Sequence, residues 1–174
     1  PATSDQFVYV GRLTVEKNPA VFCEACRLAG VKGVIAGDGP LRKKLEASYP
    51  EITFLGWQSP HSVVGDLRAS RALVMPSAWE ETFGLSVVDA MANGIPPIIS
   101  SMIGAKDWVD HGETGMVVDA LTPEAFADAI RCMTPETANR MGQRAFQNVS
   151  SNPPTVEKHV DALLNFYSEL LSQN

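Results

Sequence analysis

Short apolar runs alternate with longer amphipathic segments along the chain. The runs are rich in β-branched residues and end at glycine, proline or polar residues, which is typical of buried strands. We expect six strands, over residues 7–10, 32–36, 52–55, 72–75, 97–100 and 116–118. Between and after them, apolar residues recur every three or four positions, as in helices. This spacing predicts helices over residues 19–29, 40–48, 60–69, 84–94, 105–110, 123–133, 135–149 and 155–172.

This alternation predicts an α/β fold, a Rossmann-like doubly wound parallel six-stranded sheet with helices on both faces. Such sheets bind ligands at the carboxyl ends of their strands, where the strand order reverses. The polar and glycine-rich stretches follow the first four strands, so we expect them on one edge. We find no repeat, linker or low-complexity segment, and we treat residues 1–174 as a single domain.

Two local signals concern helix ends. Asn18 is expected to cap the helix that follows it, with Pro19 in the first helical position. The last predicted helix, over residues 155–172, has a continuous apolar face that needs a partner surface. From periodicity alone, we expect this helix to cover the domain itself.

Charge and hydropathy exclude some functions. The net charge is −6 and the pI is near 5.0, so a broad basic surface for nucleic acid is not expected. No apolar run approaches the roughly 20 residues that cross a bilayer, and no signal peptide is visible. The polar opening runs straight into a strand, so we expect the chain to be part of a longer protein.

The chain has three cysteines, an odd number that suits a reducing compartment such as the cytoplasm. Cys23 and Cys26 form a C-x-x-C pair, which could indicate redox or metal chemistry. They fall within an apolar helix pattern and no second pair of ligands is near, so we interpret them as core or helix-face cysteines. We expect no metal site, and we interpret the histidines as surface or capping residues: His61, His111 and His159.

Candidate chemistry is concentrated between residues 76 and 96. A loop with two carboxylates follows a buried strand, and a helix begins near Gly84. The first turn of a helix has free N–H groups and a partial positive charge, which suit a phosphate. Glu81 precedes that turn, and Asp89 lies on the same helix face as Leu85. A nucleotide-sugar, with phosphates between two sets of hydroxyls, fits this arrangement.

This segment resembles the signature of retaining glycosyltransferases of family 4, which have the GT-B fold. Asp89 stands where the family has Glu. The matching positions are Pro76, Ser77, Glu81, Phe83, Gly84, Leu85, Ala90, Met91, Ala92, Gly94 and Pro96.

The resemblance implies that the chain is the C-terminal, donor-binding half of a group 1 glycosyltransferase. Such an enzyme transfers a sugar from a UDP- or GDP-sugar to an acceptor hydroxyl with retention, and needs no cofactor. A missing N-terminal domain would bind the acceptor, and only through it would the protein contact the inner face of a membrane. In this fold the C-terminal helix commonly crosses to the other domain, which would expose part of the apolar face of residues 155–172. We expect the isolated domain to bind nucleotide but to be inactive.

The resemblance also assigns roles. Gly11, Arg12 and Lys17 resemble the first donor motif, whose two cations would stabilise the leaving diphosphate in place of a metal. Glu81 would contact the donor sugar and support its developing positive charge. Asp89 would hold the ribose, although Asp is about 1.5 Å shorter than Glu. Without the signature, solvated loop cations and a surface Asp would be the simpler interpretations.

Other positions complete the expected donor site. Gly37 belongs to a G-x-G-P turn, which is not a dinucleotide fingerprint because Arg42 takes the sixth place. Trp57 either stacks on the base or packs as an ordinary core residue. The start of the signature helix contributes Phe83, Gly84, Leu85 and Ser86. Two alternatives stay open: a non-catalytic nucleotide-sugar-binding module, and a GT-B nucleotide-sugar epimerase.

Overall fold

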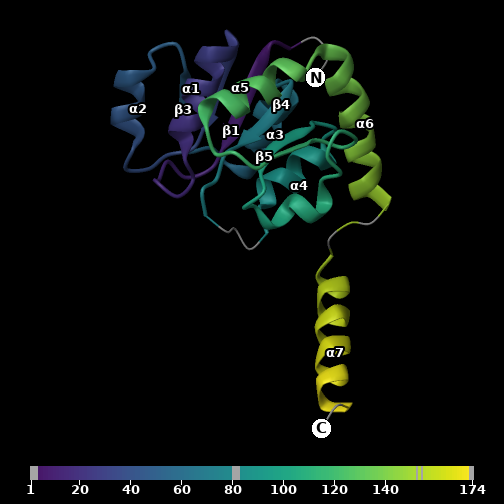
Figure 1. The fold of residues 1–174 in the computed structure, drawn as a ribbon. Coiled ribbons are helices and arrows are strands. Elements are labelled where there is room, and N and C mark those ends of the chain that lie inside the picture. Colours follow the sequence, from purple (N-terminus) through teal and green to yellow (C-terminus); the bar gives the residue numbers. More distant parts are fainter. Residues whose placement is uncertain (1–3, 80–82, 152, 154, 173–174) are drawn as a thin grey trace.

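A computed structural model of the chain describes residues 4–79, 83–151, 153 and 155–172. Six parallel strands form its sheet, in the order β3-β2-β1-β4-β5-β6 (Figure 1). The strands are β1 (Gln6–Val10), β2 (Lys32–Ala36), β3 (Thr53–Gly56), β4 (Ala72–Met75), β5 (Pro97–Ser100) and β6 (Met116–Val118). The order reverses between β1 and β4, which is the doubly wound arrangement that the sequence predicts.

Helices cover both faces of this sheet (Figure 1). The helices of the described residues are α1 (Pro19–Ala29), α2 (Arg42–Ser48), α3 (Pro60–Arg68), α4 (Leu85–Ala92), the 3₁₀ helix η1 (Gly104–Trp108), α5 (Pro123–Cys132), α6 (Pro135–Ser151) and α7 (Val156–Ser172), of which α7 does not cover the sheet (Figure 1). Helix α1 packs on α5, and α4 packs on α6. Because both faces are covered, all four residues of β4 and all four of β5 are buried.

The expected elements are all present, with small shifts at their ends. The second helix begins at Arg42 instead of residue 40. The expectation that Asn18 caps α1 through its side chain is wrong. Asn18 has a left-handed backbone (φ 53°) and makes no side-chain capping bond. A side-chain cap needs an extended backbone at that position. Pro19 takes the first position of the helix, as predicted.

Helix α7 extends away from the layered part of the molecule (Figure 1). The expectation that it covers this domain is therefore wrong, and its apolar side chains are exposed. They include Val160, Leu163, Leu164, Phe166, Tyr167, Leu170 and Leu171. The periodicity of the segment was sufficient to identify the helix, but not its partner surface.

Two glycines bring α6 directly onto the end of α4. A Cβ atom on Gly142 would lie 2.1 Å from the backbone oxygen of Gly94. No side chain fits at that separation, so the contact is made by backbone alone.

We predict that Gly142→Ala lowers the free energy of unfolding by about 1–3 kcal/mol, because the added methyl group forces α6 away from α4. Urea unfolding measures this change. Gly65→Ala is the matched control in α3, where an added Cβ meets no atom within 4 Å. There the loss of backbone freedom in the unfolded chain should stabilise the fold by roughly 0.5–1 kcal/mol. Equal unfolding midpoints for the two variants would contradict the backbone contact.

Candidate functional site

The loops that follow β1, β2 and β3 surround a hollow at the carboxyl edge of the sheet. Its volume is about 240 Å³, and it is lined by Val10, Gly11, Arg12, Ala36, Gly37, Asp38, Trp57, Gln58 and Val63. The structure therefore brings together four of the residues singled out in the sequence: Gly11, Arg12, Gly37 and Trp57. They meet because the carboxyl ends of parallel strands share one edge.

Two of these loops pack backbone against backbone. A Cβ atom on Gly37 would lie 1.9 Å from the backbone oxygen of Gly11. Beyond this contact, the amide of Leu13 donates to the Asp38 oxygen at 2.9 Å. The turn at Gly37 thus has a structural role that the motif alone did not indicate.

Asp38 and Arg42 organise the β2 loop, and the sequence analysis gave neither residue a role. The Asp38 carboxylate accepts a hydrogen bond from the Gly39 amide at 2.7 Å and another from Arg42 Nη1 at 3.0 Å. Both bonds lower the pKa of Asp38 below its usual value, and the bond from the Gly39 amide has the larger effect. The spacing of four residues between Asp38 and Arg42 was the available signal.

Trp57 lies at the mouth of the hollow with 75% of its surface exposed. Its interpretation as an ordinary packed tryptophan is therefore wrong, and the stacking alternative stays open. Next to it, the Gln58 side chain donates from Nε2 to the Leu55 oxygen at 3.0 Å. That bond holds a further polar side chain at the hollow, which sequence reasoning missed because a single Gln in a loop carries no distinctive pattern.

The loop after β1 carries the two expected cations. Arg12 is exposed, and Lys17 is half-buried. Between them, Leu13 is fully buried and anchors the loop in the core. The buried Tyr9 donates its hydroxyl to the Arg12 oxygen at 2.8 Å. The backbone that carries Arg12 is thus fixed from below.

Hydrogen bonds join this loop to the one after β4. The amide of Ala78 donates to the Glu16 oxygen at 2.8 Å, and the Ser77 hydroxyl contacts the same oxygen at 3.2 Å. The Ser100 hydroxyl at the end of β5 donates to the Ser77 oxygen at 2.6 Å. Both serines are buried. The loops after β1 and β4 and the end of β5 are therefore connected, and we call these bonds the serine clamp.

Helix α4 begins at the same edge. Gly84 has a left-handed backbone (φ 78°), and a Cβ atom there would lie 2.8 Å from Ile103. The side chain of Phe83 packs edge-on against Trp108. Leu85 is exposed, and Ser86 is half-buried. The first N–H groups of α4 have no partner within the helix, so this end is suited to an anion. Residues 80–82, and with them Glu81, lie outside the described residues.

Asp89 lies one turn further along α4. Within the described chain its carboxylate has no hydrogen-bond partner, and desolvation by its surroundings raises its pKa above the usual value. Its acceptor oxygens are therefore available to a ligand.

The cysteines and histidines lie elsewhere. Cys23 and Cys26 are buried in the core, as interpreted, and burial raises the pKa of Cys23 to about 12. His61 is exposed, and His111 contacts the backbone of Val117 through Nδ1. Among the described residues, no three His, Cys, Asp or Glu side chains are grouped as metal ligands. In the same part of the chain, no helix has the length and apolarity to cross a bilayer.

Comparison with known proteins gives consistent matches. The family model of group 1 glycosyl transferases matches residues 1–148. A UDP-Gal:α-D-GlcNAc-diphosphoundecaprenol α-1,3-galactosyltransferase of Escherichia coli is 27% identical over 95% of this chain and 46% of its own length. A GDP-mannose-dependent α-(1-6)-phosphatidylinositol dimannoside mannosyltransferase of Mycobacterium tuberculosis is 36% identical over 71% of this chain and 34% of its own length.

Among solved structures, sucrose-phosphate synthase from Thermosynechococcus elongatus shares the fold with a TM-score of 0.82 and 25% identity. The match covers 100% of this chain and 47% of that one. The chain thus spans less than half the length of each of these three relatives.

We predict that Ser100→Ala loosens the serine clamp. The change leaves the buried oxygen of Ser77 without its donor, which should cost about 1–3 kcal/mol of unfolding free energy. Hydrogen exchange at the Ala78 amide should become faster, because that amide bonds to Glu16 next to the lost contact. Ser150→Ala is the matched control, because it changes an exposed serine on α6. An unchanged exchange rate at Ala78 would show that the loops after β1 and β4 are held together independently of Ser100.

Proposed function

The chain belongs to the family of group 1 glycosyl transferases, and on that premise we propose that it is the donor-binding half of a retaining glycosyltransferase. The observation that carries the proposal is the hollow shared by Gly11, Arg12, Gly37 and Trp57 at the carboxyl edge of the sheet. Its donor is a UDP- or GDP-sugar, the classes named in two of its relatives.

The diphosphate binds between the loop after β1 and the start of α4. Arg12 and Lys17 contribute positive charge from one side, and the N–H groups of Leu85 and Ser86 from the other. The serine clamp supports this proposal, because it ties the loop of both cations to the segment that leads into α4. The cations do the work of a metal ion, so the proposal includes none.

The nucleoside extends from the diphosphate into the hollow. The exposed ring of Trp57 offers a stacking surface to the base. The free carboxylate of Asp89 accepts hydrogen bonds from the ribose hydroxyls. Glu81 contacts the sugar of the donor, as its place in the signature suggests.

In the proposed reaction, the bond between the anomeric carbon and the diphosphate oxygen breaks, and its electron pair leaves with the nucleoside diphosphate. The acceptor oxygen bonds to the anomeric carbon on the same face, and a phosphate oxygen takes its proton. Arg12 and Lys17 stabilise the charge on the leaving group, which is larger in the transition state than in the substrate. Glu81 stabilises the positive charge on the sugar ring. The anomeric configuration of the transferred sugar in the product, compared with that in the donor, tests whether the reaction proceeds with retention.

The acceptor lies on a second, N-terminal domain of the full-length protein. The chain's coverage of less than half of each relative supports this division. The isolated domain then binds nucleotide without appreciable turnover, because the acceptor and one wall of the cleft are missing.

We predict that calorimetric titration of this chain with UDP, GDP and ADP shows saturable binding of one nucleotide. The double variant Arg12→Ala, Lys17→Ala should weaken that binding at least about tenfold, because each cation makes charge-assisted hydrogen bonds to the phosphates. Lys43→Ala, Lys44→Ala is the matched control, since it removes the same charge from the exposed side of α2. Equal losses in both double variants would indicate a general charge effect. No binding by the chain or by the full-length protein would refute the donor site.

We predict that nucleotide affinity also depends on the ionisation of Asp89. Its pKa is raised, so its carboxylate gains a proton at a higher pH than an ordinary Asp does. Affinity should be full above that pKa and should fall as the pH is lowered through it, because a protonated carboxyl is a poorer acceptor for the ribose. Asp89→Asn should bind more weakly at neutral pH and lack this part of the pH profile. Titrations between neutral pH and about 4 measure the difference. Identical profiles for the two proteins would exclude Asp89 as the ribose ligand.

A further inference from the structure

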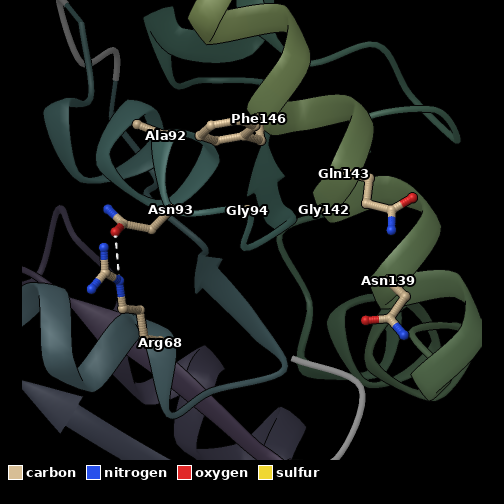
Figure 2. A pocket seen from close by; sticks show the side chains of 8 residues that line it. All are labelled: Arg68, Ala92, Asn93, Gly94, Asn139, Gly142, Gln143 and Phe146. Carbon is tan, nitrogen blue, oxygen red and sulfur yellow. Dashed lines mark hydrogen bonds between the residues drawn. The ribbon is translucent and has the colours of Figure 1, made fainter.

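A second hollow lies at the other end of α4 (Figure 2). Its volume is about 390 Å³, and its lining comes from the ends of α3 and α4 and from α6. The lining residues are Arg68, Ala92, Asn93, Gly94, Asn139, Gly142, Gln143 and Phe146. We call it the α4–α6 groove. The helical rise from Leu85 to Asn93 alone is about 12 Å, and the two hollows share no lining residue. The groove is therefore separate from the candidate donor site.

The floor of the groove is backbone. Gly94 and Gly142 meet there without side chains, as the 2.1 Å approach of a hypothetical Cβ atom shows. Polar side chains stand on either side of this floor, with Arg68 and Asn93 opposite Asn139 and Gln143 (Figure 2). The groove thus has two polar walls and a floor that lets a ligand approach closely.

One hydrogen bond orients the exposed side chain of Arg68. Its Nε donates to Asn93 Oδ1 at 2.9 Å, and Asn93 Nδ2 donates to the backbone carbonyl oxygen of Asp89 at 2.8 Å. Both ends of the Asn93 amide are therefore engaged. Within the described residues, the two terminal nitrogens of Arg68 have no hydrogen-bond partner, so they stay available as donors.

The opposite wall offers both donors and acceptors. The side-chain amides of Asn139 and Gln143 lie one turn apart on α6 and are exposed. Neither amide has a hydrogen-bond partner in the described part of the chain. Phe146, at one end of the groove, exposes 50% of its surface. No fold-stabilising interaction of the described residues uses these amides.

We infer that the α4–α6 groove binds a saccharide. A sugar hydroxyl both donates and accepts hydrogen bonds, as each of the two free amides does. The fork of Arg68 can donate to two neighbouring oxygens. The exposed ring of Phe146 matches the C–H face of a pyranose. This combination of a few polar groups with an aromatic surface is typical of small-molecule sites.

The charge of the groove narrows the choice of ligand. Its lining carries one charge, which is positive, and no carboxylate. A metal ion or a basic peptide would therefore find no counter-charge there. A simple anion such as phosphate would engage Arg68 but leave the amides of α6 and the ring of Phe146 unused. A neutral or acidic saccharide uses all three.

This assignment rests on the proposed function in one respect: the proposed enzyme adds a sugar to an acceptor hydroxyl, and a saccharide carries such hydroxyls. The groove would then hold a part of the acceptor saccharide that is distant from its reacting end. Helix α4 would connect the two sites, with its first turn at the donor and its last turn at the held saccharide.

The test is a nuclear magnetic resonance titration of the ¹⁵N-labelled chain with maltoheptaose, with oligogalacturonate and with inorganic phosphate. We expect saturable shifts of the side-chain amides of Asn139 and Gln143, and of the backbone amides of residues 92–94, with one or both saccharides. Arg68→Ala and Gln143→Ala should each weaken this binding about tenfold. Gln147→Ala is the matched control: its side chain is exposed on α6 and does not line the groove.

Two results would overturn the inference. One is that neither saccharide changes the chemical shifts of the groove residues. The other is that only phosphate changes chemical shifts, and only at Arg68. Addition of UDP to the same sample tests the proposed function separately, through shifts at Gly11 and Gly37. Shifts with UDP and none with either saccharide would reject saccharide binding in the groove and keep the donor site. Shifts with saccharide, and no binding of UDP, GDP or ADP by this chain or by the full-length protein, would reject the donor site and keep the groove.

Discussion

The serine clamp is the contact on which the geometry of the carboxyl edge depends. At the reversal of strand order, the chains leaving β1 and β4 turn to opposite faces of the sheet, so nothing in the strand ladder holds their loops together. The bonds of Ala78 and Ser77 to Glu16, and of Ser100 to Ser77, supply that connection. The bond of Ser100 to Ser77 is buried, and a buried hydrogen bond is expensive to leave unmade. The loop of Arg12 and the segment leading into α4 therefore keep one relative position.

Backbone contacts at glycines determine the shape of both hollows. At the carboxyl edge of the sheet, Gly37 lets the β2 loop lie directly on Gly11, and the side chains of Arg12, Asp38 and Trp57 line the hollow there. At the other end of the molecule, Gly142 and Gly94 do the same for α6 and α4. In both places the floor is backbone, because glycine has no side chain to cover it. A larger residue would separate the elements as well as fill the space.

Helix α4 runs from the carboxyl edge of the sheet to the groove. Its first turn lies at that edge, and its last residues lead into Asn93 and Gly94 in the groove. The Asn93 side chain also donates to the backbone carbonyl oxygen of Asp89. The groove wall and the proposed ribose ligand therefore belong to one short element. A ligand at either end would contact the same helix, which gives the molecule a direct structural connection between two surfaces.

The sequence by itself determined the strands, the helices and their parallel arrangement, because these depend on local periodicity and on residues such as Pro19 and Gly84. It also predicted that Gly11, Arg12, Gly37 and Trp57 would share an edge, since parallel strands end together. Tertiary structure alone decided that Trp57 is exposed, that Asn18 does not cap α1, that α7 leaves the domain, and that Ser77, Ser100 and Gln58 organise the loops. The bonds of Ser77 and Ser100 depend on contacts between segments far apart in the chain. The Gln58 bond and the left-handed backbone of Asn18 are local, but the residue types alone do not indicate them. No pattern within a single segment records which surface another segment will present to it.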